Sequence, residues 1–262
     1  MPDHNRSVCT LTWHDRAAGY RVFFNRDERR ERKPGLPPEV RESGGTRFIA
    51  PQDGDFGGTW IASNEHGLSV CLLNGFPAGA AAPARARTEF TTRGELPRLA
   101  IALASSAEVA AWLNAHDLTR FRPFLLVTFE VGGAGLVADW SGIALSIKCG
   151  RPVEQPLVSS SFYSEEVRRS RVAVFRDFER QSAGSAEPAM HLAFHASHRP
   201  AEGPHSPCMH RPDASTVSFS QVEVDARQVR FHYAPHSPCR GLPAGPGVRL
   251  ARRVPGDPRA AP

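Results

Sequence analysis

The 262-residue sequence lacks the marks of several large protein classes. It has no apolar run near the ~20 residues of a membrane-spanning helix, and its first residues lack the apolar stretch of a secretion signal. Its cysteines number five, an odd count without paired spacing, which does not indicate a disulfide scaffold. No Gly-rich phosphate-binding loop follows a predicted strand. We therefore expect a cytoplasmic protein without a nucleotide or other cofactor and without a membrane partner.

Lysine is scarce, since Lys33 and Lys148 are the only two, and arginine carries nearly all of the positive charge. The net charge is +5, but the basic residues are spread along the chain, and the basic run at 26–33 contains three acidic residues of its own. No basic stripe alternates with aromatic residues, so binding of nucleic acid is not expected. Hydrophobic residues make up 40% and charged residues 23%, which is typical of an ordinary globular protein with a buried core.

The order of predicted elements favours an α+β protein. Short segments rich in β-branched and aromatic residues come in adjacent pairs, separated by turn residues and by a proline-rich loop at 34–38. Two capping-box spacings, Thr92 with Glu95 and Ser105 with Glu108, then indicate helices. The strongest helix signal covers 164–181. The strand segments are 8–13, 20–24, 59–62, 68–73, 124–130, 136–140, 143–147, 216–224 and 229–233. Paired strands, then helices, then strands indicate a layered domain.

Several short motifs occur in a fixed order along the first half of the chain. They are Cys9-Thr10 on the first predicted strand, Asn25-Arg26-Asp27-Glu28 at the end of the second, Gly57-Gly58-Thr59-Trp60, Asn64-Glu65-His66-Gly67, and Leu73-Asn74. Further blocks are Arg93-Gly94-Glu95-Leu96, Arg122-Pro123-Phe124 and Ser159-Ser160-Ser161. This ordered set resembles the NRDE-motif family, also called the transport and Golgi organisation 2 family, from about residue 9 to residue 161.

That family is similar to the N-terminal nucleophile hydrolases of the choloylglycine hydrolase and penicillin V acylase type. The resemblance implies a four-layer αββα sandwich of two antiparallel sheets, and an amidohydrolase that cleaves a small acylated amide. Those enzymes begin with a Cys-Thr pair and carry an arginine and an acidic residue on the next strand. The resemblance makes Cys9, Arg26, Asp27 and Asn74 the candidate catalytic residues, and Asn25, Glu28, Trp60 and Asn64 candidate binding residues.

The chemistry expected of such a site follows from the residue types. A thiol is nucleophilic as its thiolate, and a free α-amine on the same residue has a pKa close to that of the thiol, so Cys9 would supply both nucleophile and base. Arg26 would lower the pKa of the thiol, and Asp27, or Glu28 in a register shifted by one, would hold the amine. The carboxamide of Asn74 would donate to the oxyanion.

Eight residues precede Cys9, and a cysteine whose nitrogen is acylated has no amine base. Two hypotheses restore it: translation that begins at Val8 with a GTG codon followed by removal of the initiator Met, or cleavage between Val8 and Cys9. We accordingly divide the chain into an extension at 1–8 that is absent from the mature protein, one domain at 9–235, and a poorly ordered Pro/Gly/Arg-rich tail at 236–262.

Each candidate also has a structural interpretation. Cys9 would then be a small buried strand residue, Arg26 and Asp27 an ion pair, and Asn64 a turn residue. The alternative function is a non-catalytic protein that binds or transfers a small metabolite or haem, as the resemblance to eukaryotic family members suggests. No Cys-Pro pair of the kind associated with haem binding occurs. In either case the expected partner is a small molecule selected by loops such as 75–86 and 202–213.

A second pattern lies in the C-terminal third, where His205-Ser206-Pro207-Cys208 recurs as His236-Ser237-Pro238-Cys239. Two imidazoles and two thiolates are a ligand set that zinc accepts. The half-motif is not a standard zinc knuckle, however, and its prolines restrict the backbone. We therefore predict no metal site.

Overall fold

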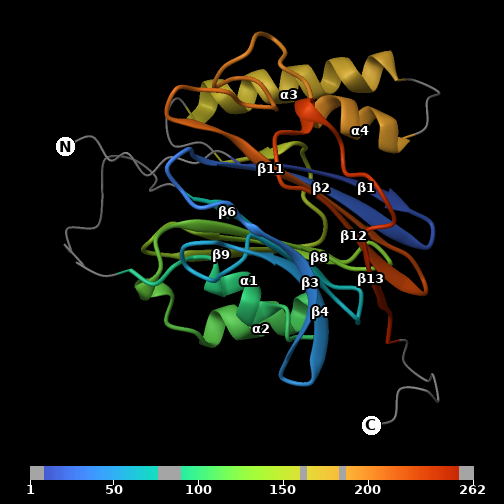
Figure 1. The fold of residues 1–262 in the computed structure, drawn as a ribbon. Coiled ribbons are helices and arrows are strands. Elements are labelled where there is room, and N and C mark those ends of the chain that lie inside the picture. The colour runs from blue at the N-terminus through green and yellow to red at the C-terminus, as the bar shows by residue number, and fades with distance from the viewer. Residues whose placement is uncertain (1–8, 76–89, 160–163, 183–186, 254–262) are drawn as a thin grey trace.

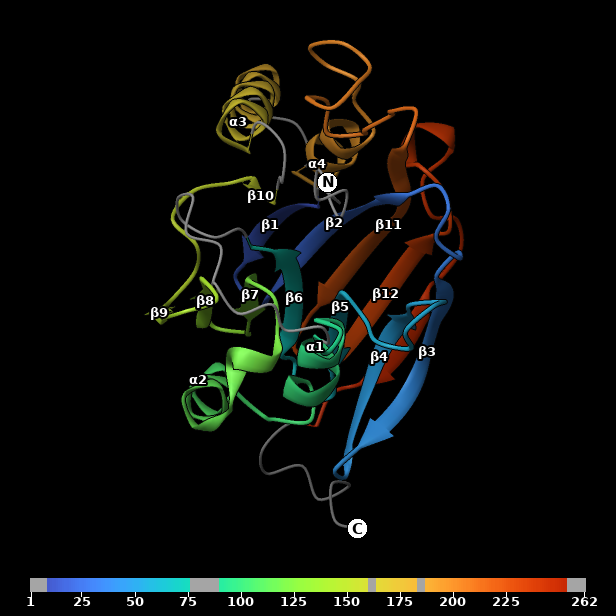
Figure 2. The same ribbon diagram turned by 90° about the vertical axis from the view of Figure 1, so that its left-hand side faces the viewer.

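The structure is a computed structural model, and it describes residues 9–75, 90–159, 164–182 and 187–253. Two antiparallel sheets lie face to face, and helices cover the outer face of each sheet (Figures 1 and 2). One helical layer is formed by α3 (Ser164–Gln181) and α4 (Glu187–His195), and the other by α1 (Glu95–Ala100) and α2 (Ser106–Ala115). This arrangement confirms the predicted four-layer αββα sandwich of an α+β protein.

The first sheet, which carries α3 and α4, has six strands in the order β10-β1-β2-β11-β12-β13. Their bounds are β1 (Thr10–Arg16), β2 (Gly19–Arg29), β10 (Leu157–Val158), β11 (Ala214–Val224), β12 (Gln228–Ala234) and β13 (Val248–Ala251). The predicted hairpin of the first two strands is confirmed, and its register pairs Thr10 with Asn25. Strand β11 lies along the other side of β2, so the end of β2 has a neighbouring strand on each side.

The second sheet, which carries α1 and α2, has seven strands in sequence order from β3 to β9. Their bounds are β3 (Leu36–Ser43), β4 (Thr46–Gln52), β5 (Ile61–Asn64), β6 (Ser69–Asn74), β7 (Phe124–Phe129), β8 (Gly135–Trp140) and β9 (Leu145–Cys149). The strand β3 begins inside the segment predicted to be a proline-rich loop. Because β3 is an edge strand, Pro37 and Pro38 need no partner for the N–H group that proline lacks.

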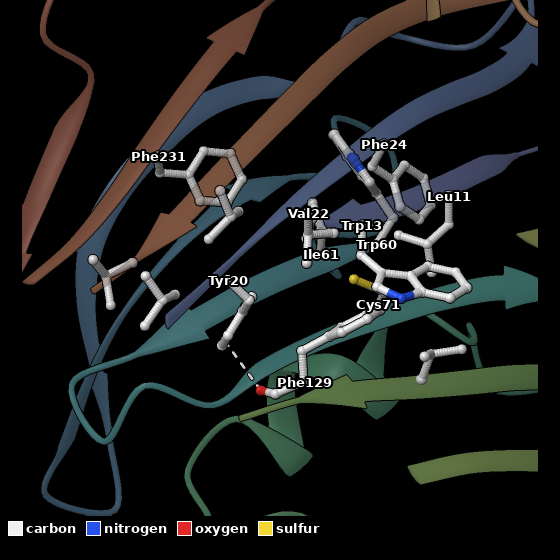
Figure 3. Packing of buried hydrophobic residues seen from close by; sticks show 14 of the residues in the cluster. Leu11, Trp13, Tyr20, Val22, Phe24, Trp60, Ile61, Cys71, Phe129 and Phe231 are labelled. Atoms are coloured by element: carbon white, nitrogen blue, oxygen red, sulfur yellow. Dashed lines mark hydrogen bonds between the residues drawn. The ribbon is translucent and has the colours of Figure 1, made fainter. Parts of the chain in front are cut away.

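An apolar core fills the space between the two sheets, as Figure 3 shows. Side chains alternate along each strand, and one face of β1, β2, β12, β5, β6 and β7 contributes to this core. Tyr20 is fully buried there, and its hydroxyl is held by Ser69 Oγ at 2.8 Å and by the main-chain oxygen of Phe129 at 3.0 Å. The core therefore locks the first hairpin against the second sheet.

The two short helices of the second layer begin differently. Ser105 caps α2 as predicted, because its hydroxyl accepts a hydrogen bond from the main chain of Glu108 at 3.2 Å. The predicted capping box of Thr92 does not form, since the N-cap of α1 is Gly94 and has no side-chain cap. Gly94 packs on Gly58 so closely that a Cβ at Gly58 would lie 2.6 Å from its carbonyl carbon. The backbone preceding α1 is thus held against the loop that leads to Trp60 and β5.

The segment at 236–262 differs from the poorly ordered tail that the composition predicts. Its described part contains a short 3₁₀ helix, η2 (Pro238–Arg240), and β13, which pairs with β12 at the edge of the first sheet. Leu250 of β13 is buried in the core between the sheets, which explains why this stretch is part of the fold. Residues 254–262 lie outside the described residues, as do residues 1–8 and most of the predicted loop at 75–86. A second 3₁₀ helix, η1 (Leu118–Arg120), precedes β7.

Among the described residues, none of the helices combines the length and the apolar composition that crossing a bilayer requires.

Candidate active site

A cavity of about 720 Å³ opens where the start of β1 meets the ends of β2, β4 and β6. It is lined by Cys9, Arg26, Asp27, Glu28, Arg32, Asp53, Phe56, Thr59, Trp60, Leu72, Asn74, Phe90, Thr91, Thr92, Arg93, Gly94 and Arg122. All four candidate catalytic residues are among them, although Cys9 precedes β1, Arg26 and Asp27 lie on β2, and Asn74 ends β6. The cavity is large enough for a small organic substrate.

Cys9 stands directly before β1 and is buried. Its main-chain nitrogen donates a hydrogen bond to Ser159 Oγ at 3.0 Å, and Ser159 in turn donates its own N–H to the carbonyl of Cys9 at 3.0 Å. Burial and the nearby Asp27 carboxylate raise the pKa of the Cys9 thiol to about 12, against the smaller lowering effect of Arg26. With a peptide nitrogen at Cys9, the sulfur is therefore a neutral thiol at physiological pH.

The Asn-Arg-Asp-Glu tetrad lies at the end of β2, where alternation divides it between the two faces of the sheet. Arg26 and Glu28 contact groups of the cavity, whereas Asn25 and the Asp27 carboxylate contact groups beneath the helical layer of α3 and α4. The four residues consequently have two different kinds of surroundings. This division separates Asp27 from Glu28, which the sequence left as alternatives for one role.

Arg26 is nearly buried and is fixed from two directions. Its Nη2 lies 2.6 Å from Asp53 Oδ2 and 3.4 Å from Glu28 Oε2, and its guanidinium carbon lies 4.2 Å from the ring centroid of Trp60. Asp53 also binds Arg32 at 2.7 Å. Arg26 therefore forms part of a charged network on one wall of the cavity, in which Glu28 and Trp60 position its guanidinium.

Asp27 is fully buried, and its carboxylate is bound from the helix side. Thr216 Oγ1 on β11 donates to Oδ1 at 2.5 Å, and Arg171 Nη2 on α3 lies 3.5 Å from Oδ2. Burial raises the pKa of Asp27 to about 7, with Arg171 and the Thr216 hydrogen bond opposing the shift. Asp27 therefore changes its charge near neutral pH. That change alters the electrostatic potential at Cys9, because the Asp27 charge acts on the thiol.

Two candidate binding residues lie elsewhere, because neither is part of the described cavity lining. The carboxamide of Asn25 donates to the main-chain oxygens of His195 and Pro207, at 3.0 and 2.8 Å. The carboxamide of Asn64 donates to the main-chain oxygens of Ile101 and Leu103, both at 2.8 Å. Asn64 also accepts from the turn that follows it, at 3.0 and 3.1 Å. In this structure both side chains connect loops.

Arginines at the cavity are the functional candidates that the sequence reasoning did not single out. Arg93 and Arg122 line it from the strand-free segments before α1 and β7. Burial and the neighbouring Arg122 lower the pKa of Arg93 to about 10, with Cys9 and Glu28 acting in the opposite direction. Arg93 Nη1 donates to the main-chain oxygen of Pro123 at 2.8 Å. Neither arginine forms an ion pair with a carboxylate among the residues that the structure describes.

The signal for these two arginines was present in the sequence, since each opens one of the blocks quoted above. Their role was not visible, because contacts between distant segments, such as that of Gly94 with Gly58, bring Arg93 to the cavity wall. Ser159 and Arg171 are similar cases. Ser159 opens a quoted block, whereas nothing in the amphipathic pattern of α3 marks Arg171 as a fully buried charge.

The two His-Ser-Pro-Cys segments are brought near each other, but with different histidines. Ligand atoms of Cys208 and Cys239 lie together with those of His198 and His210, whereas His205 and His236 are outside this group. Of the two histidines and two cysteines in the repeated segments, only the two cysteines belong to this group.

Two face-to-face antiparallel sheets between two helical layers form an αββα sandwich of the type found in N-terminal nucleophile hydrolases. The chain is similar to a Caenorhabditis elegans ortholog of N-acylethanolamine-hydrolyzing acid amidase, with a TM-score of 0.50 at 14% identity over 82% of this chain and 91% of that one. The likeness shows the fold.

Two further solved structures are also similar. They are penicillin V acylase from Agrobacterium tumefaciens, with TM-score 0.44 and 13% identity over 87% of this chain and 83% of that chain, and a mutant of conjugated bile acid hydrolase from Clostridium perfringens, with TM-score 0.49 and 10% identity over 95% of this chain and 97% of that chain.

The chain belongs to the family described as transport and Golgi organisation 2, whose model matches residues 8–146. The predicted family is thereby confirmed. No curated protein sequence matches the chain.

Proposed function

We propose that the mature protein, beginning at Cys9, is an amidohydrolase that cleaves a small acylated amide through a thioester. The observation that carries this proposal is the position of Cys9 in the wall of a cavity that Arg26, Asp27 and Asn74 also line. An acid amidase, an acylase and a bile acid hydrolase are among the structures of similar fold. Their likeness supports the fold, and the cavity residues support the chemistry.

The free α-amine of Cys9 is the base in this mechanism. It takes the thiol proton, and the sulfur forms a bond to the amide carbonyl carbon. The oxyanion accepts a hydrogen bond from the Asn74 carboxamide, which lines the same cavity. The C–N bond then breaks, and the protonated amine of Cys9 returns its proton to the leaving nitrogen. Water attacks the thioester, the C–S bond breaks, and the carboxylic acid leaves with the thiol restored.

The surroundings of Cys9 supply what its terminal amine needs. Ser159 Oγ, which accepts from the Cys9 nitrogen at 3.0 Å, would hold one N–H of the amine. Asp27 acts on the thiol through its charge, and a positive α-ammonium beside it would counter the effect that raises the thiol pKa to about 12. Removal of residues 1–8 therefore changes the ionisation of the sulfur as well as the availability of a base.

The charges at the cavity also indicate a substrate class. Arg93 and Arg122 face the cavity, and each has no carboxylate in an ion pair among the described residues. Arginine is the side chain best suited to bind a carboxylate through two parallel hydrogen bonds. We propose that the cleaved amide carries a carboxylate, as an N-acyl amino acid does, and that these two arginines bind it.

The central experiment compares two purified forms of the protein. One begins at Cys9, released from a fusion by a protease that cuts directly before it, and the other keeps residues 1–8 ahead of Cys9. We expect turnover of an N-acyl amino acid panel only by the first form, and an acyl-enzyme mass on Cys9 during single turnover. Equal turnover by both forms would contradict the N-terminal nucleophile mechanism. Absence of turnover by the Cys9 form over panels of N-acyl amino acids, lactams and acyl thioesters would contradict the hydrolase.

Variants of the Cys9 form identify the nucleophile. Cys9→Ala is expected to abolish turnover, and Cys71→Ala serves as the control, since Cys71 is also buried and does not line the cavity.

A variant of Arg93 tests the substrate class. Arg93→Gln should raise KM for N-acyl amino acids ~10-fold or more, as expected for the loss of a charged hydrogen bond. The exposed Arg98→Gln is the matched control on α1. An unchanged KM for Arg93→Gln would contradict the proposal that the substrate carries a carboxylate bound by this arginine.

A second function has one observation in its favour. In the chain that keeps residues 1–8, the Cys9 nitrogen is bound to Ser159 and its thiol has a pKa of about 12, so the cavity holds no active nucleophile. Such a form would be a binding protein for the same small molecule. This binding function predicts that Cys9→Ala leaves the equilibrium affinity for the ligand unchanged, which isothermal titration calorimetry can measure.

A further inference from the structure

Four metal-ligating side chains converge on the side of the first sheet that carries α4. His198 follows α4, Cys208 and His210 lie in the loop before β11, and Cys239 lies in η2. One ligand atom from each residue lies within 4.8 Å of all the others. Figure 1 shows the three segments, coloured orange to red, close together beside α4. The chain brings them together from positions as far apart as 198 and 239.

The spacing of the ligand atoms fits a tetrahedral zinc ion. Zn–S bonds are about 2.3 Å and Zn–N bonds about 2.0 Å, so a sulfur and a nitrogen at two corners of the tetrahedron are roughly 3.5 Å apart. The Cys208 sulfur lies 3.6 Å from His210 Nε2, and the Cys239 sulfur lies 3.4 Å from the same nitrogen. Two of the edges therefore already have the length that the metal would impose.

His198 adds an independent observation. Its Nε2 atom is buried and has no hydrogen-bond partner among the described residues, although buried polar atoms normally have one. The other ring nitrogen lies 3.9 Å from a carboxylate oxygen of Glu202. A carboxylate near the second nitrogen of a histidine is the usual outer partner of a zinc-bound imidazole. The rings of His198 and His210 meet edge to face, with centroids 5.1 Å apart.

The backbone around the four ligands is held by hydrogen bonds that do not involve a metal. Asn25 connects the end of α4 to Pro207, the residue before Cys208, through its two hydrogen bonds at 3.0 and 2.8 Å. The Cys208 N–H donates to the carbonyl of Ser197, the residue before His198, at 3.0 Å. The Ser237 hydroxyl, two residues before Cys239, donates to the carbonyl of Thr216 at 2.6 Å. The ligands are thus positioned in advance.

From this geometry we propose that His198, Cys208, His210 and Cys239 form a structural zinc site. Binding of Zn²⁺ displaces one proton from each of the two thiols, and two thiolates with two neutral imidazoles give a site without net charge. Four protein ligands leave no open coordination position, so the metal has a structural role. The zinc ion would connect the end of α4, the loop before β11 and η2 to one another, next to the start of β11, which carries Thr216.

The experiment measures the metal content of the full chain. Protein produced in zinc-containing medium, purified without chelator and dialysed, is expected to retain one zinc per chain by plasma mass spectrometry. Cys239→Ser and His210→Gln should lower the content to less than a tenth of an equivalent. His236→Gln, His205→Gln and Cys149→Ser are the matched controls, because these residues lie outside the group, and they should retain the metal.

Replacement of zinc by Co²⁺ gives a second readout that does not depend on the variants folding. The proposal predicts the visible absorption of tetrahedral Co²⁺ together with a thiolate charge-transfer band in the unmutated protein. Less than a tenth of an equivalent of zinc in that protein would overturn the site. A disulfide between Cys208 and Cys239, detected by mass after purification under reducing conditions, would overturn it as well. Neither result bears on hydrolysis, so the zinc site and the proposed function fail separately.

Discussion

The two helical layers of the sandwich contact their sheets in opposite ways. Beneath α1 and α2, Leu126, Phe124 and Leu113 belong to one continuous apolar cluster. The polar side chains buried with it include Asn64, Ser106 and Thr128, which carry no charge. Beneath α3 and α4, the buried groups include an arginine, a carboxylate, two histidines and several hydroxyls. The fully or almost fully buried polar residues of this second layer are Thr10, Thr12, Asn25, Asp27, Arg171, His191, His195 and Thr216.

This polar layer is organised around β1 and β2. Arg171 donates to the hydroxyl of Thr10 and to the carbonyl of Pro204 and faces Asp27. The Thr12 hydroxyl bonds to His191 Nδ1 at 2.8 Å and to His195 Nε2 at 2.9 Å. Burial lowers the pKa of His191 to about 3 and holds that of His195 well below its usual range, so both are neutral.

This contrast between the two layers shows where the fold buries groups that lower its stability. Burying apolar surface contributes about 25 cal/mol per Å², whereas buried charges must be paired merely to offset their desolvation. The polar layer lies directly behind Cys9 and Arg26, and its Asp27 acts on the thiol. Of the described residues in the apolar cluster, Leu72 alone also lines the cavity. The buried pair of Asp27 and Arg171 therefore lies where it can influence the candidate site.

The largest effect is expected when the buried ion pair is broken. Arg171→Met leaves Asp27 without its charged partner, and such a change typically costs ~3–5 kcal/mol when the remaining group stays charged. The pKa of Asp27 is about 7, above its unfolded value of 3.8, so below pH 5 this group is neutral in the folded protein. The loss in free energy of unfolding should therefore be larger at pH 8 than at pH 5, by urea denaturation.

The double variant Arg171→Met with Asp27→Asn is the control for that prediction, because it removes both charges. It should recover much of the loss at pH 8 and show little difference between the two pH values. A loss for Arg171→Met that does not depend on pH would mean that Asp27 is neutral throughout, and that the polar layer does not contain an ion pair.

In the apolar layer, Leu126→Ala is expected to lower the free energy of unfolding by ~2–5 kcal/mol, since it removes a fully buried side chain and leaves a cavity. No titratable group of the layer changes its partner, so the loss should be equal at pH 5 and pH 8. The comparison of the two layers fails if this variant shows the same pH dependence as Arg171→Met under the same urea conditions.

The smallest of the three effects is expected at Thr12. Thr12→Val keeps the shape but removes the hydroxyl that both histidines bind, and loss of a partner by a buried polar group costs ~1–3 kcal/mol. Thr12→Ser keeps the hydroxyl and is the matched control. Thermal unfolding at pH 7 should separate the two variants by several degrees, whereas equal stabilities would assign no energetic value to these hydrogen bonds.

Local patterns predicted many of the elements, and the order of the motifs predicted the family, but β3, β4 and β13 were not predicted. The first hairpin, the long helix α3 and the cap of α2 were predicted from residues within a few positions of each other, because turn chemistry and periodicity act over that range. The edge strand β3 was missed, since prolines indicate a loop unless the strand has no neighbour on one side. The poorly ordered tail was a wrong expectation for 236–253, because composition does not reveal that Leu250 completes the core.

The candidate site was likewise predictable from the sequence only in part. The order of motifs was enough to name Cys9, Arg26, Asp27 and Asn74, and the structure brings them to one cavity. Asn25 and Asn64 belong to the same motifs but line no part of that cavity, because the strand and the turn that carry them direct their carboxamides to loop carbonyls.

Residue patterns along the chain were enough to predict the layered α+β class, the family, and the residues from which a cysteine-dependent site can be built. Packing in three dimensions sets which face of the sheet each of these residues occupies. It divided the Asn-Arg-Asp-Glu tetrad between the cavity and the polar layer, placed Arg93 and Arg171 beside it, and exchanged two histidines in the metal-ligand group. The physical reason is that chain order fixes alternation along a strand, whereas contacts between distant segments depend on how sheets and helices pack.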